Sequence, residues 1–145
     1  AAFEHIRFSF EHLDKQLGYE ENLVELLDKL RDKNLIDDSF KKYILKKAQE
    51  ESAVIDNGIA FPHGINHQNE EILVTIGIYP EGRSVEEIEL IFLVAIPENL
   101  TLAMEDELLS FYDTIFVISS SETLREQVKR INTKEEYRQL LVKGF

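Results

Sequence analysis

Residues 87–96, "EIELIFLVAI", are almost continuously apolar from Leu90 onward. Such a run is typical of a central strand that other elements cover on both faces. Residues 71–79, "EILVTIGIY", form a second β-prone run, and residues 6–10, "IRFSF", alternate apolar and polar side chains. A short run, "GIAF" at 58–61, ends on Pro62. The sequence therefore predicts a small sheet with a fully covered centre.

Segments with helical periodicity lie before and after these runs. Residues 20–33 form the first, and a second helix, capped by Asp37 or Asp38, is expected to run to about residue 50. Further helices are predicted after residue 133 and at 101–116, where the spaced apolar residues are Leu108, Leu109, Tyr112 and Phe116. This order predicts an α/β fold, a three-layer α/β/α sandwich whose small mixed sheet is flanked by helices on both sides.

The length of 145 residues suits one domain, residues 1–145. Its start, "AAFEH", lacks a methionine, which predicts a domain excised from a longer chain. Near the other end, Ser119 and Glu122 have the spacing of a capping box, as do Thr133 and Glu136. Residues 118–123 could instead form a loop or a short extra strand, because "FVI" at 116–118 is β-prone.

The composition excludes several classes of function. Acids outnumber bases 28 to 16, so a nucleic-acid surface and binding to anionic membranes are not expected. There is no cysteine, which excludes zinc–thiolate sites and thiol catalysis. The longest apolar stretch, at 90–96, is too short to insert into a membrane, and no segment of these residues is expected to act as a signal peptide. We expect a cytoplasmic domain whose partner has a basic face.

Residues 57–67, "NGIAFPHGINH", hold the side chain best suited to chemistry, His63 between Pro62 and Gly64. A neutral imidazole is a good nucleophile near pH 7 and can carry a phosphoryl group. It needs one ring nitrogen exposed, the other held by a hydrogen bond, and backbone N–H donors for the phosphate. Pro62 stiffens the approach, and Gly64 allows close backbone passage or, at positive φ, a turned N–H.

Two other interpretations of His63 compete on sequence alone. It can be a hydrogen-bonded histidine at a strand end with no chemical role. His63 and His67 also have the spacing of a helical zinc pair, but the flanking Pro62 and Gly64 are poor in a helix and no third ligand is positioned, so no metal is expected. No Gly-x-Ser-x-Gly elbow, Walker loop or dinucleotide motif occurs, and no cofactor is expected.

The segment "NGIAFPHG" resembles the signature around the active histidine of mannitol/fructose-type enzyme IIA domains of the bacterial phosphotransferase system (PTS EIIA type 2). The resemblance extends from about residue 6 to 143 and includes "IELIFLVAIPE" at 88–98. It implies a mixed sheet flanked by helices. It also implies that His63 accepts a phosphoryl group at Nε2 from the phosphocarrier HPr and passes it to an enzyme IIB (EIIB) domain.

Three positions depart from the family's pattern. Transport-type members have a second histidine after the Pro-Glu segment, and its nearest equivalent here is Glu105, whose carboxylate would repel phosphate. The family's Glu-Arg pair reads "KK" at 46–47, which leaves Lys47 as a point charge for phosphate support. A family threonine corresponds to Ala53. His67 could be a substitute helper or a solvated loop residue, and the remaining histidines, His5 and His12, are expected at the surface.

These departures favour regulation over rapid phosphoryl relay. IIA-like domains also occur in PRD-containing transcriptional regulators and antiterminators. The resemblance to these domains implies a sensor that is phosphorylated on His63, with the other domains of the same chain as partners. A transport EIIA that serves EIIB, and a degenerate module that is no longer phosphorylated, remain as alternatives. The acidic runs "EGRSVEE" at 81–87 and "MEDE" at 104–107 are either solvated faces or, if they border His63, a dock for a basic-faced carrier.

Overall fold

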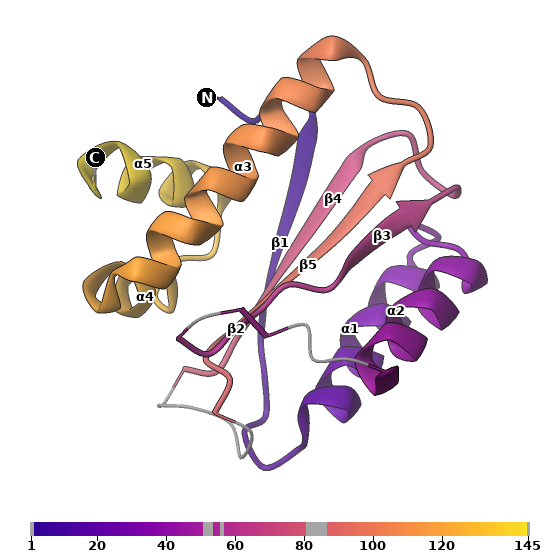
Figure 1. Cartoon of the computed structure of the whole chain (residues 1–145), viewed down its shortest axis with the longest axis horizontal. Coiled ribbons are helices and arrows are strands. Elements are labelled where there is room, and N and C mark those ends of the chain that lie inside the picture. Colours follow the sequence, from indigo (N-terminus) through magenta and orange to yellow (C-terminus); the bar gives the residue numbers. More distant parts are fainter. Residues whose placement is uncertain (1, 51–53, 56, 81–86, 145) are drawn as a thin grey trace.

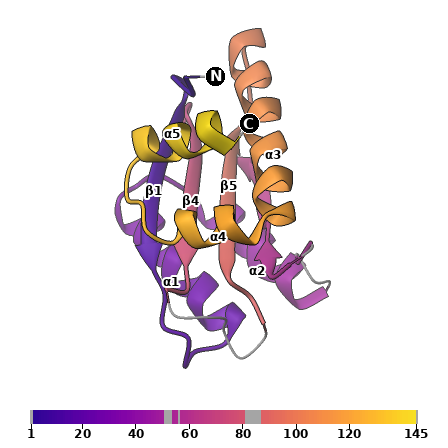
Figure 2. The same ribbon diagram turned by 90° about the vertical axis from the view of Figure 1, so that its left-hand side faces the viewer.

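The computed structural model describes residues 2–50, 54–55, 57–80 and 87–144 of the chain. In this part a mixed sheet lies between two layers of helices, as Figures 1 and 2 show from two directions. The elements in chain order are β1 (Ile6–His12), α1 (Tyr19–Asp32), α2 (Asp38–Glu50), β2 (Ile59–Ala60), β3 (His63–Asn66), β4 (Ile72–Ile78), β5 (Leu90–Pro97), α3 (Leu102–Ser120), α4 (Glu122–Val128) and α5 (Lys134–Gly144). The predicted three-layer α/β/α sandwich is confirmed.

Strand β5 lies inside the sheet, as its apolar run predicted. It pairs antiparallel with β4, which pairs parallel with β1. Its side chains alternate between two cores: Val94 faces the core that contains residues of α3, α4 and α5, and Ala95 faces the core that contains residues of α1 and α2. The sheet is therefore covered on both faces.

The other edge of β5 pairs in parallel first with β2 and then with β3. The two strands are separated at Phe61 and Pro62, because proline has no N–H to continue a ladder. The sequence predicted a strand at 58–61, and β3 was not predicted. This edge strand carries His63 at its first residue.

Helices α1 and α2 cover one face of the sheet (Figure 1). Asp37 caps α2, since its Oδ1 accepts a hydrogen bond of 2.7 Å from the N–H of Phe40. The apolar residues that give these two helices their periodicity are buried or packed against this core: Leu23, Leu26, Leu27, Leu30, Phe40, Ile44 and Leu45.

Helix α3 differs from the prediction in its length and in the face that it buries. It continues to Ser120 and α4 begins at Glu122, so the loop or strand alternative for 118–123 is wrong. Leu108 is buried, but Leu109 and Phe116 are each 59% exposed. The buried stripe is instead Met104, Leu108, Phe111, Ile115 and Ile118. Apolar residues occupy most of the helix circumference, so their spacing did not determine which face packs on the sheet.

The two predicted capping boxes had different outcomes. At α5 the Oγ1 of Thr133 accepts from the N–H of Glu136 at 3.1 Å, and the Glu136 carboxylate accepts from the Thr133 hydroxyl at 3.1 Å. At α4 the cap is Ser121, whose hydroxyl accepts from the N–H of Leu124 at 3.2 Å. The prediction of Ser119 as the cap is wrong, because Ser119 still belongs to α3.

Within the described ranges, none of the helices has the length and apolarity that crossing a bilayer requires.

Candidate active site

His63 begins the edge strand β3, opposite Val94 of β5. The N–H of Val94 donates to the carbonyl oxygen of Pro62 at 3.0 Å, so the backbone groups of residue 62 point toward β5. Backbone groups alternate in direction along a strand, and therefore the N–H groups of His63 and Ile65 point away from β5. They are available as the backbone donors that a phosphate would need.

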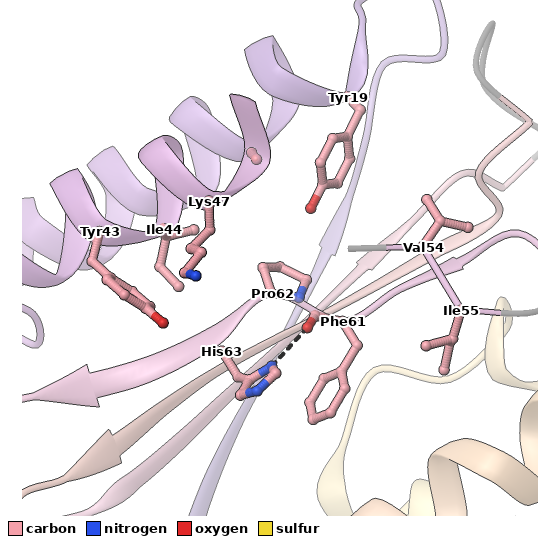
Figure 3. Close-up of a pocket in the computed structure, with 10 residues that line it drawn as sticks. Tyr19, Tyr43, Ile44, Lys47, Val54, Ile55, Phe61, Pro62 and His63 are labelled. Carbon is pink, nitrogen blue, oxygen red and sulfur yellow. Dashed lines mark hydrogen bonds between the residues drawn. The ribbon is translucent and has the colours of Figure 1, made fainter. Parts of the chain in front are cut away.

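The imidazole of His63 is held through one nitrogen. Its Nδ1 lies 2.9 Å from the carbonyl oxygen of Phe61 (Figure 3). A carbonyl can only accept, so Nδ1 carries the proton and Nε2 keeps its lone pair in the neutral ring. The ring also stacks on Phe61 with centroids 4.4 Å apart, and the residue is exposed. One ring nitrogen is thus held by a hydrogen bond and the residue is exposed, as the sequence analysis required of a histidine that carries a phosphoryl group.

Lys47 lies in the same cavity as His63. This cavity, of about 370 Å³, opens between α2 and the start of β3, and Tyr43 and Pro62 also line it (Figure 3). The Nζ of Lys47 is 5.8 Å from the centre of the Tyr43 ring. The structure thus brings the imidazole of His63 and the ammonium of Lys47 into one cavity.

Gly64 has a steric reason to be glycine. A Cβ added there would lie 2.9 Å from Cδ2 and 3.0 Å from Cε2 of Tyr43, so the absent side chain leaves room for that ring. The alternative of a positive φ at Gly64 does not hold, because the residue is part of the extended strand β3. The left-handed conformations of the signature are at Asn57 and Gly58, with φ of 55° and 74°.

His67 and Glu105 lie apart from this cavity. His67 shares a second groove, of about 540 Å³, with His63. The four residues from His63 to His67 span about 13 Å of extended chain, however. The Nδ1 of His67 lies 3.2 Å from Glu98 Oε2. Glu105 is exposed in the first turn of α3 and, among the described residues, is not part of the lining of either cavity. Ala53 and residues 81–86 of the acidic run lie outside the described residues.

Tyr112 of α3 packs behind His63 through Phe61, and the sequence did not single it out for this contact. Its ring contacts Phe61 edge-on, with centroids 5.1 Å apart, on the residue that also stacks on His63. Burial raises the pKa of Tyr112 to about 12. The tyrosine therefore supports Phe61 as a neutral phenol.

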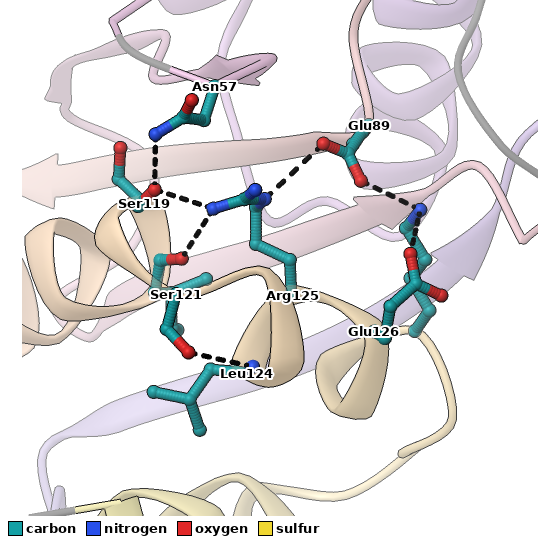
Figure 4. Close-up of polar contacts among 9 residues, drawn as sticks. Asn57, Glu89, Ser119, Ser121, Leu124, Arg125 and Glu126 are labelled. Atoms are coloured by element: carbon teal, nitrogen blue, oxygen red, sulfur yellow. Dashed lines mark hydrogen bonds and ion pairs between the residues drawn. The ribbon is translucent and has the colours of Figure 1, made fainter.

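A buried ion cluster lies behind the signature turn (Figure 4). The carboxylate of Glu89 accepts from Lys129 Nζ at 2.9 Å and lies 3.3 Å from Arg125 Nε. All three side chains are at most 8% exposed. Charges buried to this extent persist only when they are paired. The spacing of Arg125 and Lys129, beside the apolar Leu124 and Val128, was the available sequence signal for this cluster.

The same cluster holds the signature turn. Arg125 Nη1 donates to the carbonyl oxygen of Ser119 at 2.6 Å, and Asn57 Nδ2 donates to that oxygen at 2.6 Å. The carbonyl oxygen of Gly58 accepts from the N–H of Glu89 at 2.7 Å. The turn that leads into β2 and His63 is therefore tied to α3, α4 and β5.

No grouping of three or more His, Asp or Glu side chains suited to a metal ion occurs among the residues that the structure describes.

Residues 11–144 match the family described as "Phosphoenolpyruvate-dependent sugar phosphotransferase system, EIIA 2". The chain belongs to this family. It is 27% identical over 135 residues to the multiphosphoryl transfer protein of Salmonella typhi, an alignment that covers 90% of this chain and 35% of that protein. The chain thus spans about a third of the length of this relative.

Solved structures share the fold of this EIIA 2 domain. The nitrogen regulatory protein IIA-Ntr from Neisseria meningitidis superposes with a TM-score of 0.64 at 18% identity, covering 96% of this chain and 94% of that one. The complex of enzyme IIA mannitol and phosphorylated enzyme IIB mannitol from Escherichia coli gives 0.63 at 14% identity, covering 94% and 99%. The sequence resemblance to EIIA type 2 is confirmed.

Proposed function

We propose that this domain accepts a phosphoryl group on Nε2 of His63 from the phosphocarrier HPr. The observation that carries the proposal is the 2.9 Å contact from Nδ1 to the Phe61 carbonyl oxygen, which leaves Nε2 as the nucleophile. In the transfer the Nε2 lone pair forms a bond to phosphorus while the P–N bond of the donor phosphohistidine breaks. That bond's electron pair returns to the donor imidazole. The Phe61 carbonyl stabilises the positive charge that develops on the His63 ring.

In this proposal three groups stabilise the phosphoryl oxygens. The Lys47 ammonium supplies a positive charge in the cavity, and the outward N–H groups of His63 and Ile65 supply neutral donors. Pro62 and Gly64 support the site indirectly, since Pro62 ends the pairing of β2 and Gly64 leaves space for Tyr43. No cofactor enters this step.

An exposed surface of α3, the helix whose Tyr112 contacts Phe61, suits a basic-faced protein carrier such as the proposed donor. Helix α3 exposes Leu102, Leu109 and Phe116, which are spaced by seven residues and therefore share one side of the helix. Asp106 and Asp113 lie on the same helix, which contains no lysine, arginine or histidine. Such a surface would repel a second copy of itself and attract a basic-faced partner.

We further propose a regulatory, cytoplasmic role as the IIA-like domain of a PRD-containing regulator. The absence of a second histidine, with Glu105 at its nearest equivalent, supports slow phosphorylation over rapid relay. Transport to EIIB is the second candidate, favoured by the similarity to a multiphosphoryl transfer protein. The degenerate module is disfavoured because His63 is an exposed residue.

Incubation with enzyme I, HPr and phosphoenolpyruvate, followed by measurement of acid-labile phosphate, tests this function. The wild type and His67→Ala, a matched change at an exposed histidine, are expected to take up label, and His63→Ala is expected to take up none. Adding a purified EIIB domain separates the two candidates: rapid loss of label to EIIB supports transport, and retained label supports regulation. An unlabelled wild type refutes both.

A further inference from the structure

Asn66, three residues after His63, is a fully buried polar side chain at the end of β3. Its Nδ2 donates to the carbonyl oxygen of Leu35 at 2.9 Å. Its Oδ1 accepts from the N–H groups of Asp37 and Gln68, each at 3.3 Å. A buried amide is stable only with such partners. These bonds connect the end of β3 to the segment between α1 and α2.

Asp37 completes the connection with the two oxygens of its carboxylate. Oδ1 accepts from the N–H of Phe40 at 2.7 Å and caps α2. Oδ2 accepts from the N–H of His67 at 3.0 Å. One side chain therefore holds both the first turn of α2 and the residue that follows β3.

From this joint, α2 runs back along β3 toward His63. Halfway along, the Tyr43 ring packs on Gly64, where an added Cβ would lie 2.9 Å away. The Nζ of Lys47 lies 5.8 Å from the centre of that ring, as expected for a helical side chain that leans toward the N-terminus of its helix. Tyr43 is thus the contact between the backbone of β3 and the ammonium of Lys47.

The lengths of the two elements agree with this arrangement. Ten residues of helix from Asp37 to Lys47 rise about 15 Å, and three residues of strand from Asn66 to His63 span about 10 Å. With its backward lean, the Lys47 side chain reaches the level of His63, and both line one cavity (Figure 3). A slip of one residue would turn α2 by about 100° and move Lys47 away from the cavity.

We infer that Asn66, together with Asp37, is a positioning residue that sets the register of α2 against β3 and so holds Lys47 at the phosphoryl site of His63. This inference rests on the proposed function. Asn66 itself lies about 10 Å along the strand from His63 and acts through Lys47.

A double-mutant cycle on phosphoryl uptake from HPr tests the inference. Lys47→Met alone is expected to slow uptake by at least about tenfold, as for loss of a charge-stabilising donor. Asn66→Ala is expected to slow uptake about tenfold in the wild type and less than about twofold in Lys47→Met, because residues that act through one another are not additive. Equal slowing in both backgrounds, or no slowing by either single change, overturns the inference.

Two further variants separate positioning from general stability. Asn22 is also fully buried, and its Nδ2 donates to Asp14 O at 2.9 Å and to the Tyr79 hydroxyl at 2.6 Å. Asn22→Ala therefore removes a comparable side chain but is expected to leave uptake within about twofold. If Asn66→Ala does not fold, Asp37→Ser keeps one oxygen for the α2 cap and loses the one that holds His67. Asp37→Ser must then slow phosphoryl uptake in the wild type and have little further effect in Lys47→Met.

A structural readout keeps the inference testable apart from the proposed function. An NOE between the Tyr43 ring and the Gly64 Hα protons is expected in the wild type and lost in the Asn66 or Asp37 variant. If the wild type takes up no phosphate, the proposed function fails and this NOE still decides the register. A Tyr43–Gly64 cross peak of unchanged intensity in the variants overturns the inference that Asn66 and Asp37 set the register of α2 against β3.

Discussion

Replacing Glu89 with glutamine tests the buried ion cluster behind the signature turn. The change keeps the size of the side chain and removes its charge. It leaves Lys129, whose Nζ is 2.9 Å away, and Arg125, whose Nε is 3.3 Å away, as buried cations without their shared carboxylate. Breaking a buried pair by neutralising one partner costs about 3–5 kcal/mol. That is a large part of the roughly 5–15 kcal/mol by which a domain is stable.

Urea unfolding at pH 7 measures this loss. With a slope of about 2 kcal/mol per molar urea, the midpoint of Glu89→Gln is expected to fall by about 2 M. Glu71→Gln is the matched control, because Glu71 lies 3.7 Å from Arg7 with both side chains more than half exposed, and it should cost less than about 1 kcal/mol. A loss for Glu89→Gln as small as that of the control refutes the argument that the cluster is desolvated and paired.

Three further predictions concern the site. Gly64→Ala places a Cβ 2.9 Å from the Tyr43 ring and is expected to slow phosphoryl uptake at least about fivefold in the wild type but less than about twofold in a Tyr43→Ala background; equal slowing in both backgrounds contradicts the steric account. Because burial raises the pKa of Tyr112 to about 12 from the usual value near 10, the stability that this phenol contributes is present below about pH 10 and is lost as the pH rises toward 12. Tyr112→Phe should therefore flatten the fall in Tm over this range, and an unchanged slope refutes this. Glu105→His should speed uptake severalfold if this position carries the family's second histidine, and an unchanged rate in a time course would reject that assignment.

The strongly apolar parts of the fold could be predicted from the sequence. The runs that became β4 and β5 are covered on both faces, so their burial follows directly from their composition. Strand β3 was missed because its four residues include one large apolar side chain, Ile65, and that side chain is exposed on the sheet edge. The buried face of α3 was assigned in part to the wrong residues, because Leu109 and Phe116 are as apolar as the residues that pack on the sheet.

At the candidate site, His63 could be identified from the sequence, and the residues that position it could not. His63 stood out because Pro62 and Gly64 flank it and because its signature resembles that of a known family. The joint between Asp37 and Asn66 joins residues 29 positions apart, and polar side chains of this kind leave no periodic pattern in a sequence. The steric role of Gly64 depends on Tyr43 of α2, which only the packing of that helix on β3 reveals.

NMR spectroscopy of the phosphorylated domain, with ¹⁵N-labelled histidine, tests the central claim most directly. Coupling of phosphorus to Nε2 of His63, with Nδ1 still protonated against the Phe61 carbonyl, is the predicted result. Phosphorus on Nδ1 of His63, on His67, or on no histidine after incubation with enzyme I, HPr and phosphoenolpyruvate would contradict the account.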